Sequence, residues 1–315
     1  MDHGSLHDLR ADAYEYAWDN SVEPALEIES GEAVLLHVRD ASDEQINEGS
    51  GVEDVAKLDF SHVNPVSGPI YVKGAQPGDT LAVELLEFHS HGWGWTAIIP
   101  GFGLLADEFP DPWLRISHVE GDCVRWSDGI SLPLRPFPGT LGVALPEQGA
   151  HSIVPPSRFG GNMDTKHLNP GTTLYLPVGV EGALFSLGDT HAAQGDGEVC
   201  GTAIEAAMDV VLRLSVRKDV RVEAPQYDLP AGLVAEHEQS AYHVCTGVGP
   251  DLMEATRDAV RATVAWLGEQ RGLDPEEAYA IASVACDLRI HEVVDAPNWV
   301  VGCFIPLSIF EGGRG

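Results

Sequence analysis

The sequence predicts a β-rich α+β fold, with β-sandwich or β-barrel elements in the body and a two-helix α+β segment near the C-terminus. Two observations lead to this prediction. A glycine turn followed by alternating apolar residues recurs along the chain, whereas helical spacing of apolar residues is confined to one late region. A chain of 315 residues can bury one large core or two intimately packed halves.

Strands are predicted first, in the order of the chain. Glycine turns introduce strands within residues 30–38, 77–88 and 170–180, because glycine supplies the positive φ of the turn and the apolar residues that follow alternate inward. A fourth, longer strand is expected over 208–222, since apolar residues recur two apart from Val210 and would share one face.

Two helices are predicted in the last third of the chain. The first lies between Asp251, a suitable N-cap, and Gly272, which stands just past its end. The second begins after Asp274, with Pro275 at its first position and Glu277 completing a capping box. Both helices therefore carry recognisable start signals.

Two more strands, at 286–294 and 299–307, follow the helices and make the second half α+β. The turn-rich stretch 133–150 is the best place for a domain boundary. The predicted division is an N-terminal β-sandwich-like half, 1–145, and an α+β half, 146–315.

Acidic residues dominate the charge of the chain. There are 49 acidic and 18 basic residues, of which four are lysines, and the formal net charge is −31. Such a surface repels nucleic acid and anionic membranes, because binding to either needs clustered Lys and Arg. The scarcity of lysine alongside the acidity favours adaptation to high salt, where ions screen self-repulsion, over incidental acidity.

The compartment is predicted from the cysteines and the apolar runs. The five cysteines lie far apart without a Cys-x-x-Cys pair, which argues against a zinc knuckle or a disulfide framework. Free thiols and a polar N-terminus without an apolar signal core favour the cytoplasm. No run of about 18 apolar residues occurs, so a membrane-spanning helix is not expected.

Residues 158–205 hold most of the groups that can bind a metal or move a proton. Polar side chains come in pairs two apart, namely Asn162 with Asp164, Asp189 with His191, and Asp196 with Glu198. Side chains two apart on an extended backbone leave the same face, so each pair can converge on one spot. An active site is therefore favoured over a glycine-rich turn region.

Long segments of the chain follow a familiar pattern. In the centre these are GNMD, LPVGVEGALFSLGDTHAAQGDGEV and GTAIE, and further out YAWDNSVEPALEIESGEAV, NPVSGPIYVKGAQPGDTL, GWGWTAIIPGFG and DLRIHEVVDAPNWVV. Together they resemble the acetamidase/formamidase family, whose members hydrolyse short amides, over nearly the whole chain. Two positions depart from the pattern and bear on substrate preference: Tyr16 stands where many members have His, and His291-Glu292 replaces a commoner Ser-Gln.

Hydrolysis of an amide needs an activated nucleophile, charge stabilisation on the carbonyl oxygen and a proton for the leaving amine. The chain has neither a GxSxG elbow nor the Gly-Gly-Ser-Ser run of serine amidases. A nucleophilic Cys200 with Glu198 and Lys166 is one alternative, yet Cys200 falls in a predicted strand, where cysteine is more often simply buried. Water activated by a divalent metal is favoured, and carboxylate and imidazole ligands suit zinc.

The resemblance implies a metal-dependent amidohydrolase of this kind. We expect Asp164, Asp189 and His191 to be metal ligands, with zinc as the first choice of metal. Asn162 is expected to be either a further ligand or a donor to the substrate carbonyl oxygen.

Glu198 is the expected general base, which takes the water proton and returns it to ammonia. Asp196 and Gln194 are expected to orient the ligands or hold the substrate amide. Glu205 is equally well explained by a structural role, with its carboxylate satisfied in a strand by Arg213 or backbone.

The predicted function is hydrolysis of short linear amides, of the formamide and acetamide type, by a homo-oligomer (a dimer or larger). Short polar side chains and tight glycines leave little room for a large acyl group. A lactamase-like hydrolase of cyclic amides on the same metal site is one alternative, and a non-catalytic β protein that binds a small ligand is another. The surplus of proton-active groups argues against the second.

The charge generates a prediction about stability. With 31 net negative charges, self-repulsion should destabilise the folded state in dilute buffer. The Debye length falls from about 30 Å at 0.01 M to about 3 Å at 1 M salt, so we expect the melting temperature to rise steeply over this range of KCl. A melting temperature that stays constant would show that the acidity is incidental.

Overall fold

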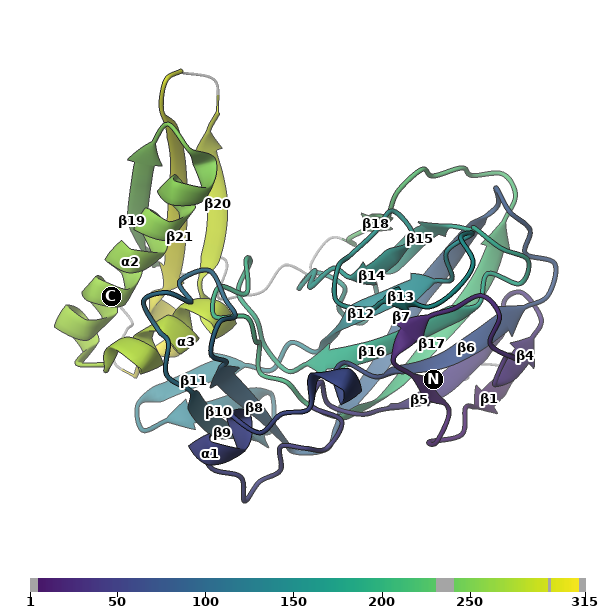
Figure 1. Cartoon of the computed structure of the whole chain (residues 1–315), viewed down its shortest axis with the longest axis horizontal. Coiled ribbons are helices and arrows are strands. Elements are labelled where there is room, and N and C mark those ends of the chain that lie inside the picture. Colours follow the sequence, from purple (N-terminus) through teal and green to yellow (C-terminus); the bar gives the residue numbers. More distant parts are fainter. Residues whose placement is uncertain (1–4, 231–240, 294–295, 312–315) are drawn as a thin grey trace.

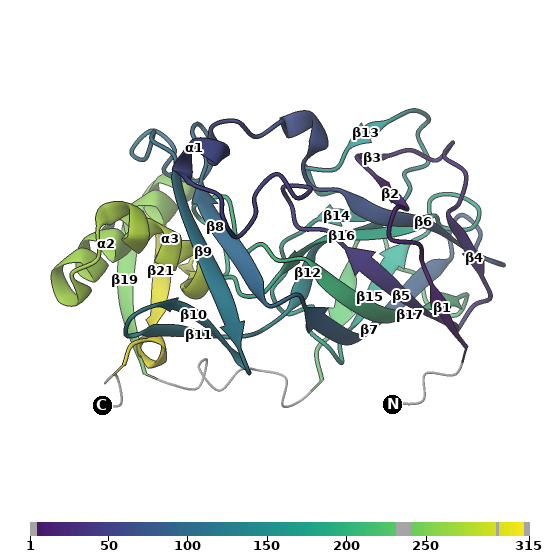
Figure 2. The same ribbon diagram turned by 90° about the horizontal axis from the view of Figure 1, so that it is seen from below.

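The computed structural model describes residues 5–230, 241–293 and 296–311, and β-strands dominate it (Figures 1 and 2). Within these ranges one six-stranded sheet has the order β1-β5-β17-β7-β15-β18. Its strands are β1 (Leu6–Asp8), β5 (Ala33–Val38), β17 (Met208–Arg217), β7 (Thr80–Ser90), β15 (Thr173–Pro177) and β18 (Gln226–Asp228).

A second six-stranded sheet has the order β14-β12-β16-β6-β2, with β4 also paired to β6. Its strands are β14 (Gly160–Asn162), β12 (Phe137–Val143), β16 (Phe185–His191), β6 (Val66–Val72), β2 (Tyr14–Glu15) and β4 (Leu26–Ile28). Leu36 and Leu212 of the first sheet and Ile70 and Leu187 of the second belong to one buried apolar core. The predicted sandwich architecture is therefore confirmed, and burial of this core is its main stabilising term.

The strands predicted from glycine turns are present as β5, β7 and β15, and the glycines before them, Gly31, Gly78 and Gly171, all have φ above +90°. The fourth strand is shorter than predicted. β17 ends at Arg217, which pairs with Thr80, the first residue of β7, so the chain beyond it has no partner strand.

A four-stranded sheet, β11-β10-β9-β8, lies beside the sandwich. Its strands are β8 (Trp93–Ile98), β9 (Trp113–Glu120), β10 (Cys123–Ser127) and β11 (Ile130–Pro133). Smaller elements are the pair β3 (Ala17–Trp18) with β13 (His151–Ser152), the helix α1 (Val52–Val55) and the 3-10 turn η1 (Phe60–His62). Glu205 forms isolated bridges to both Trp95 of β8 and His191 of β16, and so joins the two regions.

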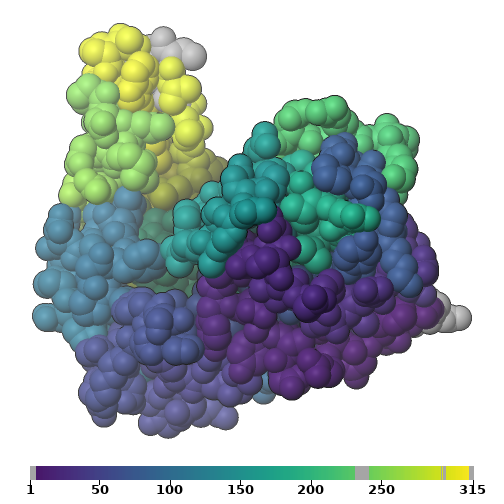
Figure 3. Space-filling model, turned by 45° about the vertical axis from the view of Figure 1, so that its right-hand side comes forward, coloured from purple at the N-terminus to yellow at the C-terminus, as the bar shows by residue number. Residues whose placement is uncertain are grey.

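The C-terminal segment forms an arm that stands away from the sandwich (Figures 1 and 3). It consists of β19 (Tyr242–Gly249), α2 (Leu252–Arg271), α3 (Pro275–Ala285), β20 (Asp287–Glu292), β21 (Trp299–Pro306) and the turn η3 (Leu307–Ile309). Both predicted C-terminal strands are found, as β20 and β21, and residue 294 of the first prediction lies outside the described residues. No helix among the described residues has both the length and the apolarity needed to cross a bilayer.

The helix boundaries agree with the predicted caps, with one exception. Asp251 accepts a hydrogen bond from the Glu254 amide at 2.9 Å, and Gly272 ends α2 with φ +70°. The capping box proposed for Glu277 was wrong. Its carboxylate instead accepts hydrogen bonds from Arg115 at 2.7 Å and from the indole of Trp126 at 3.1 Å. The charged guanidinium is a stronger hydrogen-bond donor than the backbone amide of the N-cap residue.

Both large sheets draw strands from each side of residue 145. The division into residues 1–145 and 146–315 stays a prediction, and the two halves share the sandwich core. The segment that carries the predicted functional groups supplies β14, β15 and β16 to the sandwich, and its part after β16 is hydrogen-bonded to the arm.

A close contact at the arm generates a stability prediction. A Cβ at Gly247 of β19 would lie 1.9 Å from the carbonyl oxygen of Ala255 in α2, whereas one at Gly249 would meet nothing within 4 Å. We expect Gly247→Ala to lower the free energy of unfolding by about 1–3 kcal/mol, because the helix must move outward. Gly249→Ala is the matched control and should unfold in urea like the wild type; equal effects of the two substitutions would contradict the predicted packing.

Candidate active site

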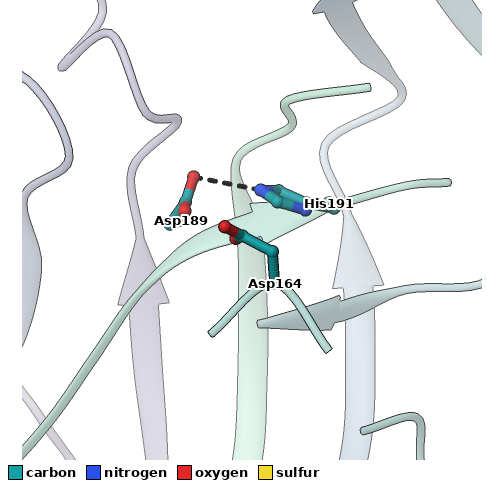
Figure 4. Close-up of side chains that lie close together, drawn as sticks. All are labelled: Asp164, Asp189 and His191. Carbon is teal, nitrogen blue, oxygen red and sulfur yellow. Dashed lines mark hydrogen bonds and ion pairs between the residues drawn. The ribbon is translucent and has the colours of Figure 1, made fainter. Parts of the chain in front are cut away.

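Two carboxylates and a histidine converge beside the end of β16. Asp189 and His191 belong to this strand, and Asp164 lies two residues past β14 (Figure 4). His191 Nε2 lies 3.1 Å from Asp189 Oδ1, and one potential ligand atom from each of the three residues lies within 4.8 Å of the others. The structure thus brings together the three residues predicted to bind a metal.

Gly139 makes this convergence possible. It lies on β12, which pairs with β16, and its carbonyl oxygen accepts the amide of Asp164 at 3.1 Å. A Cβ at this position would lie 2.6 Å from Asp164 Oδ1 and 2.7 Å from both Asp189 Oδ2 and His191 Cε1. The carboxylates therefore occupy the space that any other residue would fill.

Glu205 completes the cluster, although its sequence position did not decide between a functional and a structural role. Its Oε2 lies 3.1 Å from His191 Nε2, and its Oε1 accepts the Ala203 amide at 2.8 Å. The alternative partner, Arg213, instead binds Glu84 at 2.9 Å. Glu205 reaches the site because its backbone forms a bridge to that of His191.

Gln194 fixes the orientation of the His191 ring. Its amide nitrogen donates to the carbonyl oxygen of Asp164 at 2.8 Å, which turns its Oε1 toward His191 Nδ1, also at 2.8 Å. Nδ1 must then carry a proton, so Nε2 is the ring atom that faces Asp189 and Glu205. Both the oxygen and the nitrogen of the Gln194 side chain are hydrogen-bonded to other protein groups. This geometry fits the prediction that Gln194 orients a ligand better than the prediction that it holds the substrate amide.

Four residues around the cluster have left-handed backbone conformations although none is glycine. Their φ angles are +56° for Asn64, +47° for Asp164, +56° for Asp189 and +42° for Glu198. Each such residue costs roughly 1–3 kcal/mol and persists only where its surroundings impose the conformation. Strained backbone of this kind is typical of functional sites, where it aims side chains that regular structure would point elsewhere.

The cluster is crowded with buried negative charge. Burial and the neighbouring Asp189 raise the pKa of Asp164 to about 6, and burial raises the pKa of Glu205 to about 7. The pKa of Glu198 is raised well above its usual range by burial and by Asp164. Burial alone would lower the pKa of His191, yet the carboxylates of Glu205 and Asp189 raise it well above the usual value.

The site has more acceptors than donors. Among the described residues, Asp164 Oδ1 and Glu205 Oε2 are buried without a hydrogen-bond donor, because the one ring atom His191 Nε2 cannot serve every carboxylate around it. Unpaired buried carboxylate oxygens are costly unless a cation joins them. Carboxylate oxygens and an imidazole nitrogen are a ligand set that suits zinc, so the residues present fit a divalent metal.

Asn162 lies beside the cluster with one side of its amide already used. The hydroxyl of Thr140 donates to Asn162 Oδ1 at 2.6 Å and receives the Asn64 amide at 3.2 Å. This arrangement leaves Asn162 Nδ2 as the donor available to the adjacent pocket, which Asn162 lines. Of its two predicted roles, the geometry fits a donor better than a ligand.

Asp196, by contrast, faces away from the cluster. Its carboxylate lies 3.7 Å from Lys166 Nζ, and its amide donates to Asp287 Oδ1 at 3.1 Å. Lys166 also contacts Asp287. Burial raises the pKa of Asp287, but the ammonium of Lys166 outweighs this effect and holds the pKa below its usual range. Asp196 does not line the pocket and is placed to hold the loop against the arm.

The cysteine alternative does not fit this arrangement. Cys200 is fully buried, its Sγ lies 3.6 Å from the Ala97 carbonyl oxygen, and burial raises the pKa of its thiol. A nucleophilic cysteine needs a lowered pKa and access to the substrate. Cys200 has neither, and Lys166 is engaged by Asp287.

A pocket of about 400 Å³ opens in front of the cluster. Its polar lining residues include Asn162, Asp164, Asp189, Glu198 and Glu205. The other walls are mainly apolar and are formed by Leu58, Phe60, Val63, Trp95, Ile99, Phe102 and Val154.

The expectation of a tight site with little room for an acyl group was therefore wrong. Two glycines of the motif, Gly188 and Gly195, do not narrow the pocket, because they pack against the backbone of neighbouring segments. A Cβ at Gly188 would lie 2.2 Å from the Pro65 carbonyl oxygen, and one at Gly195 would lie 1.9 Å from that of Cys286. Their function is close packing behind the carboxylates.

Known proteins are similar to this chain in sequence and architecture. The model of the acetamidase/formamidase family matches residues 6–148 and 145–312. A formamidase of Methylophilus methylotrophus is 26% identical over 90% of this chain and 86% of its own. Among solved structures, a γ-lactamase from Delftia acidovorans covers 95% of this chain and 90% of its own, with a TM-score of 0.89 and 26% identity. An acetamidase from Bacillus halodurans covers 98% of this chain and 100% of its own, with a TM-score of 0.68 and 32% identity.

Proposed function

Because this chain belongs to the acetamidase/formamidase family, we propose that it hydrolyses short-chain amides, of the formamide and acetamide type, to a carboxylate and ammonia. The observation that carries this proposal is the cluster of buried carboxylates around His191 Nε2 at the polar side of an otherwise apolar pocket. A binding protein for a neutral ligand has no use for so many proton-active groups.

The proposal includes a divalent metal, with zinc as the first choice. His191 Nε2 and the carboxylates of Asp189, Glu205 and Asp164 would hold it, since their atoms lie close together and Asp164 Oδ1 and Glu205 Oε2 have no hydrogen-bond donor. A cation bound there supplies a lowered pKa for water and polarisation of the amide carbonyl. Gln194 keeps the imidazole oriented for this role, because its Oε1 accepts the proton of His191 Nδ1.

Glu198 is proposed as the group that moves the proton. It lines the pocket beside Asp164, and its raised pKa suits a base that must later act as an acid near neutral pH. Its carboxylate takes a proton from the attacking water as the oxygen bonds to the carbonyl carbon. It then delivers this proton to the leaving nitrogen as the carbon–nitrogen bond breaks, which releases ammonia.

Asn162 is proposed to stabilise the charge that develops on the carbonyl oxygen. Its Oδ1 is held by Thr140, so Nδ2 is a fixed donor that needs no rearrangement during the reaction. The chain of hydrogen bonds from Asn64 through Thr140 to Asn162 is thus a positioning device for one amide group.

Hydrolysis of a cyclic amide is the second candidate function. The similarity in structure to the γ-lactamase, with a TM-score of 0.89 against 0.68 for the acetamidase, favours it. Ring opening needs the same attacking water, oxyanion donor and proton transfer, so the residue assignments above stay the same.

The proposal predicts ammonia release from a panel of formamide, acetamide and small lactams in the presence of zinc. Glu198→Gln should lower kcat by roughly 10²–10⁴-fold, because the variant has no general base, while it keeps its bound metal. Removal of the metal by a chelator should abolish activity, and added zinc should restore it.

Glu269→Gln is the matched control, since Glu269 is an exposed glutamate on α2 far along the chain from the cluster, and its activity should equal that of the wild type. Ammonia assays and metal analysis of all three proteins report the outcome. Unchanged turnover in Glu198→Gln, or full activity in a metal-free preparation, would contradict the proposed mechanism.

A further inference from the structure

The apolar walls of the pocket have no part in the proposed chemistry, and we propose that they bind a neutral, apolar acyl group larger than the methyl group of acetamide. Branched aliphatic and aromatic carboxamides are the substrate class that fits. This inference rests on the proposed hydrolysis of amides and specifies which amides the site prefers.

The size of the pocket supports this substrate class. A water molecule takes about 30 Å³ in the liquid, so the four heavy atoms of acetamide fill roughly a third of the 400 Å³ available. An aromatic carboxamide with about nine heavy atoms fills most of the space. A small substrate would leave water against the apolar walls, which lowers its affinity.

The walls are built from segments far apart in the sequence. Phe60 comes from η1, Phe102 from the loop after β8, and Val154 from the turn after β13. These side chains are 62%, 48% and 47% exposed, which makes them three of the large apolar residues that the fold leaves in contact with solvent. Exposed apolar side chains that gather at one pocket indicate a binding surface.

Three contacts support the side chains of this surface. The indole nitrogen of Trp95 donates to Asp40 Oδ1 at 2.9 Å, which holds the ring as a wall of the pocket. Behind Phe60, the ring of His62 packs edge-on against Tyr16 with centroids 5.1 Å apart. Tyr16 in turn donates to Asp43 Oδ2 at 2.5 Å. The residue that departs from the family pattern therefore supports the turn that presents Phe60.

The charges of the pocket exclude an anionic acyl group. Of the described residues that line it, none is Lys, Arg or His, whereas Asp164, Asp189, Glu198 and Glu205 are acidic. A second carboxylate on the substrate would find no cationic side chain among these residues, and the proposed zinc would already be neutralised by the carboxylates that hold it. A neutral acyl group meets neither penalty.

The test is a series of kcat/KM values for acetamide, propionamide, isobutyramide, benzamide and the anion succinamate, with zinc present. One methylene in an apolar pocket changes specificity by roughly 10-fold or more. We expect kcat/KM to rise at least about 10-fold from acetamide to isobutyramide or benzamide, and succinamate to be the poorest substrate.

Phe60→Ala and Phe102→Ala should lower kcat/KM for benzamide by about 10-fold more than for acetamide, mainly through KM, because in the proposed binding mode both side chains contact only the acyl group. Ile290→Ala is the matched control, since Ile290 is 60% exposed but lies on β20 of the arm, outside the pocket. It should leave both values unchanged, and melting temperatures confirm that each variant is folded.

Hydrolysis of acetamide with no gain for the larger amides would overturn this inference and leave the proposed function intact. Equal losses on acetamide and benzamide in the two phenylalanine variants would overturn it as well. If none of these amides releases ammonia, the proposed function and this inference both fall.

Discussion

Several carboxylates buried around one imidazole nitrogen are the constraint on which the site depends. Gln194 turns His191 so that Nε2 faces Asp189 and Glu205, each 3.1 Å away, and Asp164 closes the group. One nitrogen cannot satisfy these oxygens, and Asp164 Oδ1 and Glu205 Oε2 are buried without a hydrogen-bond donor. The arrangement is therefore stable only if some carboxyl groups hold protons or a cation joins them, and both solutions suit a site that transfers protons.

Packing in the rest of the fold holds these carboxylates and His191 close together, although their burial is unfavourable. The sandwich fixes β16, and Gly139 on β12 leaves the space that the side chains fill. The arm secures the loop after Gln194, since the Gly195 amide donates to the Ser283 carbonyl oxygen at 2.8 Å and Tyr279 binds the Val199 carbonyl oxygen. Folding of the sandwich core and packing of the arm together offset the strain and the buried charge.

Local patterns in the sequence predicted much of the fold and part of the site. Pairs two apart predicted that Asp189 lies with His191 and Asn162 near Asp164, as side chains on one face of a strand do. Regular strand geometry is only part of the reason, because Asp164 and Asp189 have left-handed backbone conformations. Glu205 and Gly139 could not be assigned, since strand pairing over long distances brings them to the site. The size of the pocket was missed for the same reason, because its walls come from segments far apart in the sequence.

The most direct test of our central proposal is X-ray diffraction from crystals grown with zinc, recorded on both sides of the zinc absorption edge. We expect one strong anomalous peak beside His191 Nε2, between the carboxylates of Asp189 and Glu205, and the loss of this peak in His191→Ala crystals. An active enzyme whose zinc-grown crystals show no anomalous peak at this position would contradict the proposal that these residues bind a metal.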